Sequence, residues 1–250
     1  MSTSAPVTSA LVTGASRGIG LGIATRLARR GYALTVAARD PERLEAAAGR
    51  LRAAGAPDVQ AVAGDIAVED YLGSLVQTHA ARFDKMDALV LNAGVGSAGP
   101  LADFHPRRFD KQVTLNLRAP YVLLQQALPL LRKAAAANPA GGAKVVALSS
   151  ITGVYAEPDL AVYGATKAAL MSLVRSVNRE EAGDGVCATA VCPAYVDTDM
   201  AAYVHERIPA EDMIAVADIV EVVDACLRLS ARVTVPEIVM ARSRSDGHGA

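Results

Sequence analysis

Tyr163 and Lys167 stand four residues apart where apolar residues begin to recur at helical spacing. This spacing puts both side chains on one helix face, about 6 Å apart at Cβ. A free phenol has a pKa near 10 and exchanges protons poorly at pH 7, whereas a nearby ammonium stabilises the phenolate and lowers that pKa. The pair therefore predicts proton transfer near neutral pH, although ordinary helical surface pairs show the same spacing.

A glycine-rich turn near the start of the chain could hold a phosphate. Residues 9–13 form a short apolar run, three glycines follow at Gly14, Gly18 and Gly20, and the next apolar residues recur at helical spacing. Glycines let the backbone approach a pyrophosphate closely, and the amino end of the following helix offers unpaired amides to the anion. The order of strand, turn and helix favours dinucleotide binding over simple tight packing.

Alternating strands and helices are expected to position these groups. The expected strands cover residues 9–13, 33–38, 59–63, 87–91, 144–149, 186–192 and 237–240. This alternation predicts an α/β fold: a doubly wound, mostly parallel, Rossmann-like sheet of about seven strands with helices on both faces. We expect a single domain over residues 1–250, with mobile tails at 1–7 and 243–250.

A long helical pattern runs over residues 107–137 and contains Pro120 and Pro129. Proline lacks the backbone donor that a helix interior needs, so we expect a bend or a break in this stretch.

The composition of the chain indicates which classes of partner to expect. The 250 residues carry 25 basic and 26 acidic side chains, a net charge of -1, and only 4% aromatic residues, which argues against nucleic acid as a partner. No uncharged run reaches the 18 residues of a membrane span, so no membrane partner is expected. Three cysteines, Cys187, Cys192 and Cys226, are too few and odd in number for a disulfide framework, which favours the cytoplasm. A small molecule is the expected partner.

Four motifs occur together in a characteristic order: Thr13-Gly14-x-x-x-Gly18-x-Gly20, then Asn92-Ala93-Gly94, then Ser150 thirteen residues before Tyr163, and Tyr163-x-x-x-Lys167. In this order and spacing the chain resembles the short-chain dehydrogenase/reductase family over roughly residues 8–240. The resemblance implies an oxidoreductase that interconverts a carbonyl and an alcohol by hydride transfer with a nicotinamide cofactor.

By this resemblance Tyr163 is the general acid or base, and Lys167 lowers the pKa of Tyr163 and binds the nicotinamide ribose. Ser150 matches the serine that holds the substrate oxygen, and it fits the motif better than its neighbour Ser149. Asn116 matches the asparagine that links the lysine to a water-borne proton relay, with an ordinary polar position of the long helix as the alternative.

The expected cofactor-binding residues follow the ends of successive strands: Gly14, Ser16, Arg17, Gly18, Ile19, Gly20, Arg39, Asp65, Ile66, Asn92, Ala93, Gly94, Tyr163, Lys167, Pro193, Val196 and Thr198. Of these, Asp65 could instead cap the next helix.

Charge at the end of the second strand indicates which dinucleotide binds. An acidic residue there accepts hydrogen bonds from the ribose diol of NAD and repels the phosphate of NADP. Here Ala38 takes that place, Arg39 follows, and Arg17 adds a guanidinium suited to a phosphate. NADP(H) is therefore predicted, with Asp40 assigned as the cap of a helix that starts at Pro41.

The substrate pocket is expected from residues 95–105 and 195–215. Their apolar side chains either line the pocket or pack into a lid: Val95, Leu101, Phe104, Tyr195, Met200, Tyr203 and Ile208. Where the family usually has Pro-Gly after the sixth strand, this chain has Pro193-Ala194, and the bulky Tyr195 follows. Ala194 lacks the conformational freedom of glycine, so this loop is expected to differ in shape from that of the family.

Other readings stay open. A non-catalytic NADP-binding regulator or scaffold would share the glycine turn but has no chemical need for the whole proton-transfer set. A methyltransferase on a similar sheet has no use for the tyrosine and lysine.

No metal site is expected from the scattered histidines. Asp197 and Asp199 resemble a paired carboxylate site but are better explained as helix caps, and Cys192 is expected to be a packed strand residue rather than a nucleophile. Family analogy suggests a homodimer or homotetramer.

Overall fold

Seven parallel strands form one sheet in a computed structural model that describes residues 7–243, 245 and 247. The sheet order is β3-β2-β1-β4-β5-β6-β7. The strands are β1 (Ser9–Thr13), β2 (Ala33–Ala38), β3 (Val59–Ala63), β4 (Ala88–Leu91), β5 (Ala143–Leu148), β6 (Val186–Pro193) and β7 (Glu237–Met240). The predicted doubly wound parallel sheet is confirmed. The strand order reverses between β1 and β4, and at such a point the carboxyl ends of the strands leave a crevice for ligands.

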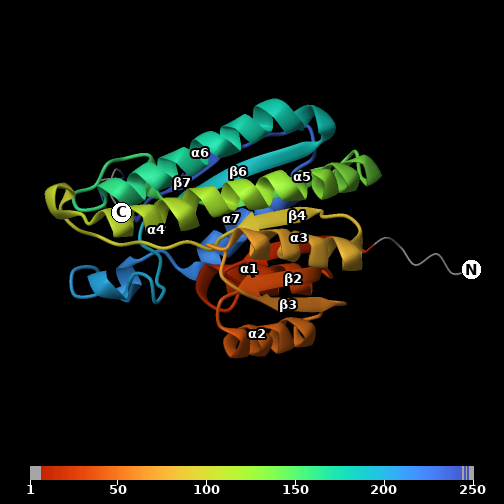
Figure 1. Cartoon of the computed structure of the whole chain (residues 1–250), viewed down its shortest axis with the longest axis horizontal. Helices are drawn as coiled ribbons and strands as arrows, with labels where there is room; N and C mark the ends of the chain where they lie inside the picture. Colours follow the sequence, from red (N-terminus) through yellow and green to blue (C-terminus); the bar gives the residue numbers. More distant parts are fainter. Residues whose placement is uncertain (1–6, 244, 246, 248–250) are drawn as a thin grey trace, which may run out of the picture.

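Helices cover both faces of the sheet (Figure 1). The helices are α1 (Gly18–Arg29), α2 (Pro41–Ala53), α3 (Glu69–Phe83), α4 (Pro106–Val113), α5 (Ala119–Ala137), α6 (Ala161–Glu181) and α7 (Val216–Arg228). Apolar residues of α1, α2 and α7 pack on one face, and those of α3, α5 and α6 pack on the other. The predicted tails at 1–7 and 243–250 lie largely outside the described residues.

Strand side chains alternate between the two cores, as a sheet buried on both faces requires. On β1, Leu11 packs with the α3, α5 and α6 face, whereas Ala10 and Val12 pack with the α1, α2 and α7 face. All five residues of β1 are buried, as expected for a strand that has a neighbour on each side and helices on both faces.

The predicted break in the long helix is a π-helical turn over Thr114–Arg118, between α4 and α5. Pro120 lies in the first turn of α5, where its missing donor costs little, while Pro129 stays inside α5. The break therefore precedes the prolines. It matters for the site because it holds Leu115 and Asn116, both buried, beside the carboxyl end of the sheet.

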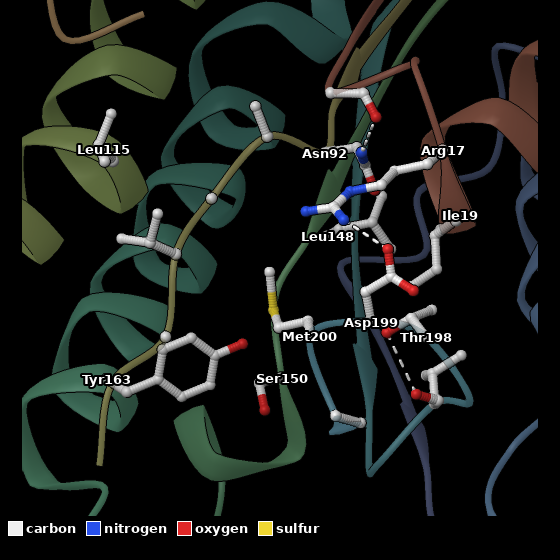
Figure 2. Close-up of a pocket in the computed structure, with 18 of the residues that line it drawn as sticks. Arg17, Ile19, Asn92, Leu115, Leu148, Ser150, Tyr163, Thr198, Asp199 and Met200 are labelled. Carbon is white, nitrogen blue, oxygen red and sulfur yellow. Dashed lines mark hydrogen bonds and ion pairs between the residues drawn. The ribbon is translucent and has the colours of Figure 1, made fainter. Parts of the chain in front are cut away.

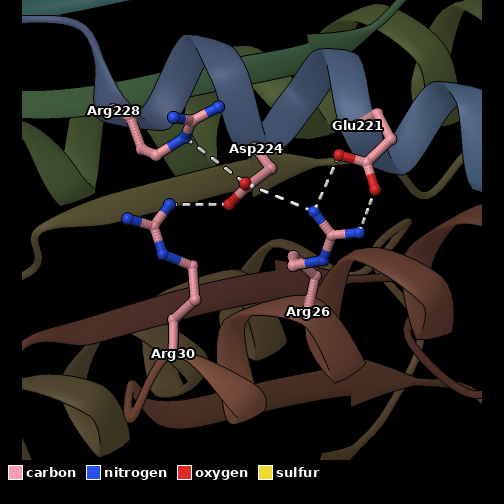
Figure 3. A network of polar contacts seen from close by, with 5 residues as sticks. All are labelled: Arg26, Arg30, Glu221, Asp224 and Arg228. Carbon is pink, nitrogen blue, oxygen red and sulfur yellow. Dashed lines mark hydrogen bonds and ion pairs between the residues drawn. The ribbon is translucent and has the colours of Figure 1, made fainter.

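A charged network fastens α1 to α7 (Figure 3). Asp224 of α7 accepts hydrogen bonds from Arg30 at 2.6 Å and Arg26 at 3.3 Å, and Arg228 lies 3.4 Å from the same carboxylate. Arg26 also pairs with Glu221. Because α1 begins at the glycine turn, this network fixes the helix that presents the turn.

Candidate active site

A cleft of about 1050 Å³ opens at the carboxyl ends of the strands. It is lined by the turns that follow β1 to β6 and by the start of α6. Most of the predicted site residues line it: Gly14, Ser16, Arg17, Gly18, Ile19, Arg39, Asp65, Ile66, Asn92, Ala93, Gly94, Ser150, Tyr163, Lys167, Pro193, Val196 and Thr198. Two predicted residues, Gly20 and Asn116, lie behind the cleft wall.

The turn between β1 and α1 needs its glycines for two different reasons. Gly14 and Gly18 have φ of 67° and 54°, in the left-handed region that favours glycine. A Cβ on Gly20 would lie 2.3 Å from the Gly14 carbonyl oxygen, so no side chain fits there. Arg17, which precedes α1, makes no side-chain cap, and the first amides of α1 therefore stay available to an anion.

The Thr13 side chain joins this turn to the end of β4. Its hydroxyl oxygen accepts hydrogen bonds from the amides of Asn92 at 3.0 Å and Ala93 at 3.1 Å. Asn92 returns the contact through its side-chain amide, which donates to the carbonyls of Thr13 and Gly14. Thr13 was not among the predicted site residues; the signal for it is its place as the last residue of the strand before the glycine turn.

Tyr163 and Ser150 lie at the other end of the cleft (Figure 2), and Lys167 also lines the cleft. Ser150 follows β5 and accepts hydrogen bonds from the amide and the hydroxyl of Thr152, while its neighbour Ser149 turns away to donate to the Lys167 carbonyl at 3.0 Å. Both serines line the cleft, so the choice of Ser150 as the residue that holds the substrate oxygen stays a prediction. The Tyr163 phenol and the Ser150 hydroxyl face the same space.

Burial acts in opposite directions on the tyrosine and the lysine. It raises the pKa of Tyr163 to about 12, an effect that a hydrogen bond with Ser150 partly offsets. It lowers the pKa of Lys167 to about 8. The Lys167 ammonium lies 5.6 Å from the Tyr163 ring centroid, but it donates its hydrogen bond to the Leu148 carbonyl at 2.7 Å. The predicted lowering of the Tyr163 pKa by Lys167 is wrong for this arrangement, because desolvation outweighs the distant charge.

Asn116 lies in the π-helical turn and does not reach the cleft. Its side chain accepts from the Val95 amide and donates to the Val95 carbonyl, both at 2.9 Å, and donates to Thr166 at 3.1 Å. It thus holds the loop after β4 against α6. No hydrogen bond joins Asn116 to Lys167 among the described residues.

Three arginines rim the cleft at the end of β2 and the glycine turn: Arg17, Arg39 and Arg43. Arg43 was not among the predicted site residues; the signal for it is its place three residues after Asp40, the cap of α2. Asp40 accepts from the amides of Glu42 and Arg43, which confirms it as the cap of α2. Its carboxylate also pairs with Arg43 at 3.2 Å.

Asp65 does not cap α3. Its carboxylate accepts from the Ala67 amide at 2.9 Å, which forms a turn before the helix, and the residue that caps α3 is Val68, without a side-chain bond. Asp65 lines the cleft instead. The predicted cap at Asp65 is therefore wrong, and its contact with a cofactor stays a prediction.

The predicted caps at Asp197 and Asp199 are wrong. The next helical turn, Ala202–Val204, is preceded by Ala201 and has no side-chain cap. Asp199 instead pairs with Arg17 across the cleft (Figure 2). Asp197 lies 3.8 Å from His205. Both carboxylates therefore contact side chains and cap no helix.

The expected substrate residues divide into two groups. Val95, Tyr195, Met200 and Tyr203 line the cleft. By contrast, Ile208 packs in a small core of the segment after β6, with Ala201, Val204 and Met213, so this part of the segment packs on itself. Leu101 and Phe104 lie outside the cleft lining.

Cys192 is fully buried in β6, where burial raises the pKa of its thiol to about 11, which agrees with a packed strand residue. Within the described residues, no three histidine, cysteine or carboxylate side chains gather as a metal site. Likewise, no described helix combines the length and apolar character needed to cross a membrane.

The sequence of this chain matches a known protein family over most of its length. The short chain dehydrogenase family model matches residues 8–209. The chain therefore belongs to the short-chain dehydrogenase/reductase family of oxidoreductase enzymes.

Particular relatives are similar over most of their length. The chain is 35% identical over 194 residues to a 3-oxoacyl-(acyl-carrier-protein) reductase of Staphylococcus aureus, covering 77% of this chain and 76% of the relative. An alcohol dehydrogenase of Thermococcus sibiricus complexed with 5-hydroxy-NADP has a TM-score of 0.84 at 30% identity, covering 95% and 97% of the two chains. A 3-oxoacyl-(acyl-carrier-protein) reductase of Brucella melitensis in complex with NAD has a TM-score of 0.85 at 28% identity, covering 95% and 96%.

Proposed function

We propose that this enzyme is an NADP(H)-dependent oxidoreductase that interconverts a ketone or aldehyde and an alcohol, with Tyr163 as general acid or base. The observation that carries the proposal is that the Tyr163 phenol and the Ser150 hydroxyl share one cleft with the glycine turn. A dinucleotide and a small carbonyl compound can both be accommodated in a cleft of about 1050 Å³.

The residues present fit a dinucleotide. A Cβ on Gly14 or on Gly20 would clash with the Asn92 side chain or the Gly14 carbonyl oxygen, so the turn keeps its shape only with glycine at these positions, and the first amides of α1 are available to a phosphate. Gly14, Gly18 and Ile19 would hold the pyrophosphate, Asp65 and Ile66 the adenine, and Lys167 the nicotinamide ribose. The bound nicotinamide supplies or accepts the hydride.

Side chains of the cleft donate the proton and position the substrate oxygen that receives it. With a pKa near 12, Tyr163 stays protonated at neutral pH and can donate its proton to a substrate oxygen during reduction. The Ser150 hydroxyl is placed to hold that oxygen. Asn116 acts as a positioning residue, because it fixes the Val95 backbone beside the cleft.

Charge favours NADP(H) over NAD(H). No acid stands at the end of β2, where Ala38 is followed by Arg39, and Arg17, Arg39 and Arg43 all line the cleft. Similar structures carry both kinds of dinucleotide, 5-hydroxy-NADP in one case and NAD in the other, so the fold alone does not decide. The choice rests on the arginines.

The test is oxidation of NADPH, followed by absorbance, against a panel of ketones, aldehydes, quinones and 3-oxoacyl thioesters, with NADH in parallel. The proposal predicts turnover with at least one carbonyl and a higher kcat/KM for NADPH. Arg39→Asp should weaken NADPH binding more than NADH binding, and an unchanged preference would show that the phosphate site is misplaced. Tight NADPH binding with no oxidation across the panel would favour the non-catalytic regulator.

The proposal includes a homodimer or homotetramer in the cytoplasm. Family analogy supports the assembly, and the sparse, unpaired cysteines support a reducing compartment. Light scattering after size exclusion should give a mass of two or four chains, and a monomer would contradict this part.

A further inference from the structure

One ion pair joins the two walls of the cleft. Arg17, in the turn after β1, pairs with Asp199, in the segment after β6, although the two residues are 182 positions apart (Figure 2). Both side chains line the cleft and are largely exposed, at 60% for Arg17 and 72% for Asp199. A ligand in the cleft can therefore reach the guanidinium as easily as the carboxylate does.

The three arginines of the rim differ in how far they are neutralised. Arg43 pairs with Asp40 at 3.2 Å, and Arg17 pairs with Asp199. Arg39 forms no ion pair with any residue that the structure describes. A phosphate that binds here thus meets one unpaired guanidinium and two that already hold a carboxylate.

We propose that Asp199 is a cofactor-specificity residue: its carboxylate competes with the 2′-phosphate of NADP(H) for Arg17 and so limits the preference over NAD(H). The inference rests on the proposed function, which places that phosphate at the arginine rim. It extends the site to a loop that also carries Met200 and Tyr203.

The competition follows from charge and geometry. A guanidinium binds a phosphate well through two parallel hydrogen bonds, and Arg17 must give up its contact with Asp199 to present them. The ribose diol of NAD(H) is uncharged, so it gains little from the freed guanidinium. Asp199 therefore acts against NADP(H) in particular. Because the pair is exposed, solvent and salt weaken it, and the effect is modest.

The experiment measures the dissociation constants of NADPH and NADH by fluorescence titration of the full chain at low salt. Asp199→Asn should tighten NADPH binding about two- to five-fold, the range expected for an exposed ion pair, and leave NADH binding unchanged. Asp199→Glu keeps the charge and should keep the wild-type ratio.

Asp197→Asn is the matched control. It removes the same charge from the same loop and from the same cleft lining, but its neighbour is His205 at 3.8 Å and not Arg17. Its effect on the NADPH to NADH ratio should be smaller than that of Asp199→Asn. In an Arg17→Gln background, Asp199→Asn should no longer change the ratio.

The outcomes distinguish a failure of this inference from a failure of the proposed function on which it rests. A wild-type protein without NADPH preference would overturn the assignment of the cofactor. Given a wild-type preference, the inference fails if Asp199→Asn tightens both dinucleotides equally, since Arg17 would then serve the shared pyrophosphate. It also fails if Asp197→Asn has the same effect, or if the effect persists without Arg17.

Discussion

Lys167 donates to the Leu148 carbonyl at 2.7 Å while its ammonium lies 5.6 Å from the Tyr163 ring centroid. The two groups are neighbours without a direct hydrogen bond. Desolvation therefore dominates both, and it keeps the phenol protonated and makes the ammonium easier to deprotonate. The helical spacing that predicts the pair does not predict this balance, because desolvation depends on what covers the pair.

A dependence of stability on pH follows from the lysine. The pKa of Lys167 is about 8 in the folded protein against its ordinary 10.5, so the unfolded chain binds more protons between these values. The free energy of unfolding then rises with pH from about 8 to 10. Lys167→Met removes this contribution. Urea unfolding of both proteins at pH 7.0, 8.5 and 9.5, without dinucleotide, should show the wild type gaining on the variant, and a constant difference would contradict the shifted pKa.

The close packing at Gly20 in the glycine turn predicts a loss of stability and of NADPH binding for Gly20→Ala. At Gly20 the new Cβ would lie 2.3 Å from the Gly14 carbonyl oxygen, so the turn must shift, at a cost of about 1–3 kcal/mol. NADPH binding should weaken at least about ten-fold, which corresponds to 1.4 kcal/mol. Titration of NADPH and urea unfolding measure the two effects.

Gly49→Ala is the control for this change. Gly49 lies inside α2 with nothing within 4 Å of its Cβ position, so alanine should stabilise the protein by about 1 kcal/mol through its helix propensity. NADPH binding should stay unchanged. If both variants behave alike, the close packing at Gly20 does not matter for the cleft.

The network between α1 and α7 predicts unequal costs for its two acids. The Asp224 side chain is 10% exposed and contacts three arginines, so Asp224→Ala should destabilise the protein by about 2 kcal/mol. The Glu221 side chain is 64% exposed, and Glu221→Ala should cost at most about 1 kcal/mol. Urea unfolding compares them, and equal losses would mean that burial does not decide the strength of this network.

The fold was predictable because its signals are local and repeated. Each strand of the sheet is a short apolar run, and Asp40 before Pro41 marks a helix start that the structure confirms. The π-helical turn at Thr114–Arg118 was harder to predict, because the prolines indicate a break somewhere in this stretch but the turn lies before Pro120. Its position depends on packing against α6, which the sequence does not state.

Within the site, motif positions were predictable and side-chain partners were not. The motifs bring Ser150, Tyr163 and Lys167 to one cleft. Asn116 was predicted together with them, yet its side-chain amide forms hydrogen bonds with Val95 and Thr166 and does not line the cleft. The partner of Asp199 lies 182 residues away, and no local pattern indicates such a contact.

The central claim is tested most directly by the kcat of Tyr163→Phe with NADPH and the best carbonyl substrate of the panel. The variant removes only the phenol oxygen, so NADPH binding and the fold should be unchanged while kcat falls about a hundred- to ten-thousand-fold. Tyr121→Phe, on the exposed side of α5, should keep the wild-type kcat. If Tyr163→Phe also turns over at the wild-type rate, Tyr163 is not the proton donor and the account is wrong.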